Sequence, residues 1–114
     1  MERNWLKECT YEEMEDKAMV LAKRVGGASN QAVRTIFTTI LEMERQPEKL
    51  PLAIHKLYYH AERNKEVKPL VREIEPLLRG KKERGEMEKL EEFVEAIVAY
   101  HLSQPWKEEG KRGG

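Results

Sequence analysis

Apolar residues recur along most of this 114-residue chain at intervals of three and four, the spacing that gathers side chains on one face of an α-helix. The clearest case is the segment 87–102, which contains no glycine or proline and places its glutamates opposite the apolar residues. A stripe this wide packs against several other helices, because a short helix takes most of its stability from burial rather than from propensity. The residues expected on its buried face are Met87, Leu90, Phe93, Val94, Ile97, Val98 and Tyr100.

Two helices are predicted in the first half of the chain, each bounded by residues that start or stop helices. Thr10 followed three residues later by Glu13 is a capping-box pattern, so the first helix should begin just after Thr10. The glycine pair at 26–27 ends it, since glycine is common just after a helix. Ser29 is expected to cap the second helix, over residues 30–45, by accepting a hydrogen bond from a free N–H of the first turn.

Prolines place a third and a fourth helix. Pro51 and Pro69 each fall in a predicted first turn, where the missing N–H of proline costs no hydrogen bond. The third helix is expected to continue to about residue 64. Pro76 lies inside the apolar pattern of the fourth helix with its ring toward solvent, so a bend or an early end is expected there.

Length and composition fit one small domain, since a chain of 114 residues can bury a single core without disulfides or metals. No strand alternation is present. We therefore predict an all-α, single-domain bundle of about five helices over residues 1–102, followed by a disordered polar tail over residues 103–114. The single cysteine, Cys9, cannot form an intrachain disulfide, and no apolar run has the length of a signal peptide or a membrane span. A cytoplasmic protein with no membrane contact is expected.

Charge is distributed unevenly along the chain. Lys and Arg together equal Asp and Glu, 21 each, which argues against a protein that binds nucleic acid through its overall charge. Residues 49–84, however, hold ten Lys and Arg against five Glu, a net charge of +5, whereas residues 1–48 and 85–114 carry −2 and −3. A basic middle segment between acidic ends is compatible with one local anion-binding surface.

Motifs for catalysis or metal binding are absent from the sequence. It has no glycine-rich phosphate loop, no His-Glu-x-x-His and no paired cysteines. His55 and His60 are five residues apart on one helix and point in different directions, and His101 falls within the apolar face of the last helix, where a hydrogen-bonded core histidine is expected. We predict no enzyme, no cofactor and no metal. Four glutamates of the last helix are expected to face water or to pair with a neighbouring helix or subunit: Glu88, Glu91, Glu92 and Glu95.

Cations lie on helix faces that the core does not use. Lys56, Tyr59 and Arg63 follow at intervals of three and four on the side of the third helix opposite its apolar residues. A solvent-facing tyrosine between two cations can hold a backbone phosphate and rest against a sugar or base, although such charges often simply face water and pair locally. On the second helix, Arg34 and Arg45 are separated by about 16 Å along the axis. The predicted RNA-binding residues are Arg34, Arg45, Lys56, Tyr59, Arg63, Lys65, Lys68 and Arg72.

Three segments, in order, resemble motifs of one family, the small subunit of type III-A CRISPR effector (Csm) complexes. Residues 93–101, Phe-Val-Glu-Ala-Ile-Val-Ala-Tyr-His, are similar to its C-terminal signature. The likeness covers roughly residues 29–102. Departures occur at Ala32, where the family often has glutamine, and at Thr35, where a basic residue is common. The two other segments are Val33-Arg34 followed by Ile36-Phe37 and Glu44, and Leu57-x-Tyr59-x-Ala61-x-Arg63.

The resemblance implies a non-catalytic subunit that stacks in several copies and lines the channel holding the guide RNA and its target, while other subunits cleave. Carried over by position, Arg34 and Arg63 would contact the RNA backbone and Tyr59 would shape the surface. The implied partners are the other subunits of the complex, guide RNA, target RNA and neighbouring copies of the chain itself. An all-α adaptor or homodimerising scaffold without nucleic acid is the alternative. A metal-dependent hydrolase using His and Glu is a more remote one.

Overall fold

Sequence signals at the helix starts are realised in the computed structural model, which describes residues 5–79 and 84–107. The Thr10 hydroxyl accepts a hydrogen bond from the Glu13 N–H at 3.1 Å, and the Glu13 carboxylate accepts one from the Thr10 N–H at 3.0 Å, so the capping box is complete. The Ser29 hydroxyl accepts from the Ala32 N–H at 3.1 Å in the same way. These bonds satisfy N–H groups that a helix start leaves without partners.

Six α-helices and two 3₁₀ turns make up the described residues, which contain no strand. The all-α, single-domain class and the five long helices are therefore confirmed. The elements are α1 (Trp5–Glu8), α2 (Tyr11–Arg24), α3 (Asn30–Arg45), η1 (Pro47–Lys49), α4 (Leu50–Arg63), η2 (Lys65–Val67), α5 (Lys68–Leu78) and α6 (Arg84–Ser103).

Differences from the predicted elements lie at helix ends. The short helix α1 was not predicted, and α6 begins at Arg84, three residues before the expected start at Met87. Helix α5 continues through the exposed Pro76 and ends two residues later at Leu78, so the early end predicted at the proline does not occur. Proline cannot donate to the preceding turn, which weakens the helix at that point.

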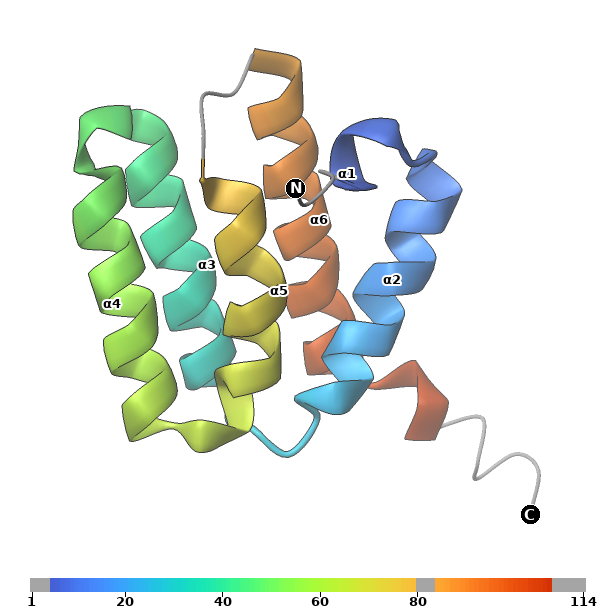
Figure 1. The fold of residues 1–114 in the computed structure, drawn as a ribbon. Coiled ribbons are helices and arrows are strands. Elements are labelled where there is room, and N and C mark those ends of the chain that lie inside the picture. The colour runs from blue at the N-terminus through green and yellow to red at the C-terminus, as the bar shows by residue number, and fades with distance from the viewer. Residues whose placement is uncertain (1–4, 80–83, 108–114) are drawn as a thin grey trace.

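The five long helices form a closed ring. Helix α6 lies between α2 and α3, α4 packs against α3 and α5, and α5 reaches α2, while the short α1 covers one end of α6 (Figure 1). Each long helix thus has two neighbours and directs its apolar face inward. The fully buried positions of α6 are Leu90, Phe93, Val94, Ile97 and His101, whereas Met87, Val98 and Tyr100, also predicted for this face, are half-buried.

Residues just after α6 lie against the bundle. The Gln104 side-chain amide donates to the Gly26 carbonyl at 3.2 Å, and Trp106 packs against the core next to the turn between α2 and α3. The predicted disordered tail is therefore wrong for residues 103–107, because an indole ring offers enough apolar area to hold the segment down. Residues 108–114 lie outside the described residues. Within the described chain, no helix is long and apolar enough to cross a membrane.

Candidate nucleic-acid interface

Helices α3 and α4 pack side by side and border an open groove of about 970 Å³, here called the α3–α4 groove. Arg34 of α3 and Lys56 and Tyr59 of α4 line it, so three of the eight predicted residues share one surface although they come from different helices. Hydroxyl and imidazole groups make up much of the rest of the wall. The groove residues used below are Arg34, Thr35, Thr38 and Glu42 from α3, and His55, Lys56, Tyr59 and His60 from α4.

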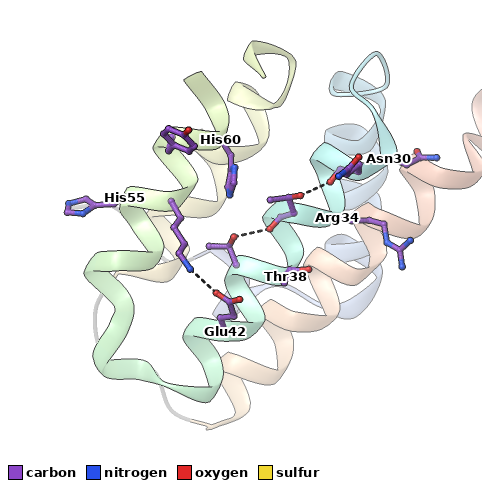
Figure 2. Close-up of a pocket in the computed structure, with 11 residues that line it drawn as sticks. Asn30, Arg34, Thr38, Glu42, His55 and His60 are labelled. Atoms are coloured by element: carbon purple, nitrogen blue, oxygen red, sulfur yellow. Dashed lines mark hydrogen bonds and ion pairs between the residues drawn. The ribbon is translucent and has the colours of Figure 1, made fainter. Parts of the chain in front are cut away.

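One cation of the groove is paired with a carboxylate that the sequence pattern does not indicate. Lys56 Nζ lies 3.2 Å from Glu42 Oε2, across the groove from α4 to α3 (Figure 2). Both side chains remain largely exposed, so the pair is worth little to stability and a competing anion can displace the carboxylate. Glu42 precedes Lys56 by 14 residues, and no helical spacing within one element links them. Only the packing of α3 on α4 brings them together.

Arg34, unlike Lys56, has no ion-pair partner among the described residues. Its side chain is exposed and, as Figure 2 shows, lies on the side of α3 turned away from α4. No carboxylate of the described residues lies within ion-pair distance of Arg34, and the same is true of Arg45, Lys65 and Arg72. These exposed cations are therefore available to an anionic ligand.

Tyr59 and Arg63 form a preassembled unit on α4. Arg63 Nη1 donates to the Tyr59 hydroxyl at 3.0 Å, and the guanidinium lies 5.6 Å from the centre of the tyrosine ring. The His60 ring meets the Tyr59 ring edge to face with 6.0 Å between centres. Tyr59 is nevertheless 58% exposed to solvent. Spacing of four residues on a helix predicts this contact, and the prediction that these side chains share an outward face is met.

A second, smaller hollow adjoins the α3–α4 groove at Tyr59. Its volume is about 280 Å³, and we call it the Tyr59 hollow. Arg63 is the one cation in its lining, which contains no carboxylate. The residues of the Tyr59 hollow used below are Gln31, Thr35, Tyr59, His60, Arg63 and Asn64.

The remaining predicted residues do not join this surface. Arg45 lies at the far end of α3, in a separate hollow that Lys56 also borders. Lys65 is exposed in η2, and Lys68 at the start of α5 pairs with Glu62 at 3.6 Å. Arg72 is exposed on α5, the helix that packs on α4 but does not line the groove. The eight residues therefore form a central group with separate cations around it.

The histidines are arranged as the sequence suggested. His101 is 2% exposed, and its Nε2 lies 2.9 Å from the Ala28 carbonyl oxygen, so the predicted core histidine is confirmed. Figure 2 shows His60 directed into the space between α3 and α4 and His55 directed away from it. Among the described residues, no group of three His, Cys, Asp or Glu side chains is placed to hold a metal ion.

An acidic seam runs along the contact of α3 with α6 and consists of Glu44, Glu88 and Glu91. Partial burial, a hydrogen bond with Glu91 and the negative charges of Glu91 and Glu88 together raise the pKa of Glu44 to about 7. A carboxyl pair of this kind holds one proton between its two oxygens. The glutamates of the last helix were expected to face water or to pair with a neighbouring helix or subunit, but their spacing gives no sign of Glu44, which belongs to another helix.

The fold and this surface define a small all-helical protein with a polar groove, cations at its rim and an exposed aromatic ring. A family model described as "Csm2 Type III-A" matches residues 8–105. The chain belongs to this family and is a small subunit of a type III-A CRISPR effector complex, as its three motifs suggested. Comparisons with curated proteins and with solved structures give no significant match.

Proposed function

We propose that this subunit lies along the ribose-phosphate backbone of the guide or target RNA through the α3–α4 groove and its rim, and that it has no catalytic role. The observation that carries the proposal is that Tyr59 borders two adjoining hollows of one exposed surface, with Arg63 beside it on α4 and Arg34 at the α3 edge of the groove. Cations position a protein on phosphates, while an exposed ring rests on a sugar or base. From the basic segment 49–84, Lys56 and Arg63 lie on this surface.

The cations are expected to contribute unequally. Arg34 and Arg63 have no ion-paired carboxylate among the described residues, so an RNA phosphate meets their full charge. Lys56 must first leave Glu42, which reduces its net contribution. Lys68 is in the same position because of Glu62. Arg34 and Arg63 are therefore the principal backbone contacts in this proposal, and Arg45, Lys65 and Arg72 are supplementary ones.

Removing the two principal cations should reduce the salt dependence of RNA binding by the assembled complex. For Arg34→Ala with Arg63→Ala, the slope of log affinity against log salt concentration is expected to fall by roughly 0.7 for each lost contact on single-stranded RNA, in every copy that touches the strand. Fluorescence anisotropy with labelled target RNA across a salt series measures this slope.

A matched control removes two exposed cations from another helix. Lys23→Ala with Arg24→Ala changes the last turn of α2, which contributes no residue to the lining of the groove or of the Tyr59 hollow, and should leave the slope unchanged. Equal slopes for the wild-type complex and for the variant lacking Arg34 and Arg63 would favour an adaptor or scaffold that touches no RNA.

Repeated copies are the second part of the proposal. The acidic seam and the exposed glutamates beside it offer a negative surface to the basic groove side of a neighbouring copy. A head-to-tail contact that does not close on itself extends into a row. Weak RNA contact by a neutral chain then adds up over several copies on one strand. The setting for such an assembly is the cytoplasm.

Neutralising the glutamate face should lower the number of copies in the purified complex. The variant carries Glu88→Gln, Glu91→Gln, Glu92→Gln and Glu95→Gln, and native mass spectrometry counts its copies. The control makes the same change of charge at scattered exposed positions: Glu12→Gln, Asp16→Asn, Glu48→Gln and Glu66→Gln. An unchanged copy number in the first variant, or an equal loss in both, would count against stacking through this face.

A further inference from the structure

We propose that the Tyr59 hollow receives an unpaired nucleobase, which stacks on the Tyr59 ring while its phosphate meets Arg63. This inference rests on the proposed RNA contact and goes further, because it makes the ligand at this point a single-stranded nucleotide rather than only a sugar-phosphate backbone. Base stacking on aromatic side chains is the usual means by which proteins hold unpaired RNA.

Three tyrosines are at least half exposed, and Tyr59 differs from the other two. The Tyr58 hydroxyl donates to Glu75 at 2.7 Å across the contact of α4 with α5, so this tyrosine has a structural partner. Tyr11 lies under the Lys89 ammonium, at 5.4 Å from the ring centre. Tyr59 lines both the groove and the smaller hollow, and within the described residues its side-chain hydrogen bond and its ring contacts are with Arg63 and His60 of its own helix. Its ring therefore borders a hollow in which a ligand can fit.

The ring is held in position before any ligand arrives. Arg63 fixes its hydroxyl by the hydrogen bond at 3.0 Å, and the edge-to-face contact with His60 restrains the other side. A restrained aromatic side chain loses little conformational entropy on binding, so more of the stacking energy appears as affinity. The guanidinium is thereby held at the rim of the same hollow.

The size and lining of the Tyr59 hollow suit one planar ring. Its volume of about 280 Å³ is slightly below the roughly 300–1,000 Å³ of pockets for larger ligands, which suits a single base. Gln31 and Asn64 stand in the wall with exposed side chains, and among the described residues neither side-chain amide has a hydrogen-bond partner. A carboxamide offers a donor and an acceptor side by side, the pattern that a base edge complements.

Charge also favours this hollow over the rest of the groove. The lining of the Tyr59 hollow contains Arg63 and no carboxylate, whereas Glu42 lies at the other end of the α3–α4 groove. A nucleotide, which carries its negative charge next to the base, therefore sits best at the Tyr59 end. The strand can then continue along the groove toward Lys56.

The test compares two RNA probes on the purified full-length chain at low salt. One probe is single-stranded oligoadenylate, and the other has the same length and the same backbone but abasic riboses. Fluorescence anisotropy gives both dissociation constants. Wild-type protein should bind the oligoadenylate roughly five- to a hundredfold more tightly than the abasic strand. Tyr59→Leu should bring this ratio close to one, and Tyr59→Phe should keep it, because the ring remains.

Tyr58→Leu is the matched control, since it removes the adjacent exposed tyrosine of the same helix and should leave the ratio unchanged. Far-UV circular dichroism checks that each variant folds. Equal binding of both probes by wild-type protein overturns base stacking but leaves backbone contact standing. A ratio that survives Tyr59→Leu places the base elsewhere and also overturns the inference. Failure to bind either probe overturns the RNA-contact proposal together with this one.

Discussion

Phe93→Ala is expected to lower the free energy of unfolding by about 3–5 kcal/mol. The Phe93 ring is fully buried in α6, and the Trp5 indole meets it edge to face with 5.0 Å between ring centres. Truncation removes the apolar area of the ring and leaves a cavity that the surrounding helices fill only in part. Because the total free energy of unfolding of a small domain is about 5–15 kcal/mol, a loss of this size leaves the variant only marginally stable.

Urea denaturation followed by circular dichroism measures the effect of Phe93→Ala. The control is Phe37→Ala, which truncates the other phenylalanine of the chain at a half-buried position on α3 and should cost clearly less. A loss below about 1 kcal/mol for Phe93→Ala, well under the range for buried aromatic residues, would contradict the placement of this ring at the centre of the core.

Glu44→Gln is expected to stabilise the protein by about 1–3 kcal/mol at pH 8 and by well under about 1 kcal/mol at pH 5. The pKa of Glu44 rises from 4.5 to about 7 on folding, chiefly through burial and then through Glu91 and Glu88. Between pH 4.5 and pH 7, the Glu44 carboxyl of the folded chain keeps a proton that the unfolded chain has released. Wild-type stability therefore falls as the pH rises through this window. Glutamine removes that loss because it stays neutral and can still donate to Glu91.

Thermal denaturation of wild type and Glu44→Gln at pH 5 and pH 8 tests this difference. Glu92→Gln serves as the control, since it removes one charge from an exposed position of α6. A gain at pH 8 that is the same for both variants would mean that general repulsion among the glutamates, and not the Glu44–Glu91 pair, is responsible. The same change in stability at both pH values would contradict the shared proton.

Helices of the ring could be predicted because each one carries its own signals. Thr10, Ser29 and the prolines mark starts, and the spacing of apolar residues marks the faces. The helix α1 could not be predicted, since four residues are too few to show a period and Trp5 is held by a contact with Phe93, which is 88 positions away. The packing of Trp106 could not be predicted for the same reason, because its position next to Gly26 depends on the finished bundle.

For the candidate site, the sequence predicted what lies within one helix and missed what lies between two. Lys56, Tyr59 and Arg63 share a face of α4 because helical spacing alone decides it. The Glu42 partner of Lys56 and the hollow that joins Tyr59 to α3 arise only when α3 packs on α4. Lys68 and Arg72, also predicted to bind RNA, lie on α5, which does not line the groove.

The closed order of helices also sets the order of events on the ribosome. Helix α6 is made after the four other long helices, yet it occupies the place between α2 and α3. Until it emerges, the sides of those two helices that pack on α6 in the finished fold have no cover. Nascent chains that stall before α6 are therefore the species most prone to aggregate or to recruit chaperones.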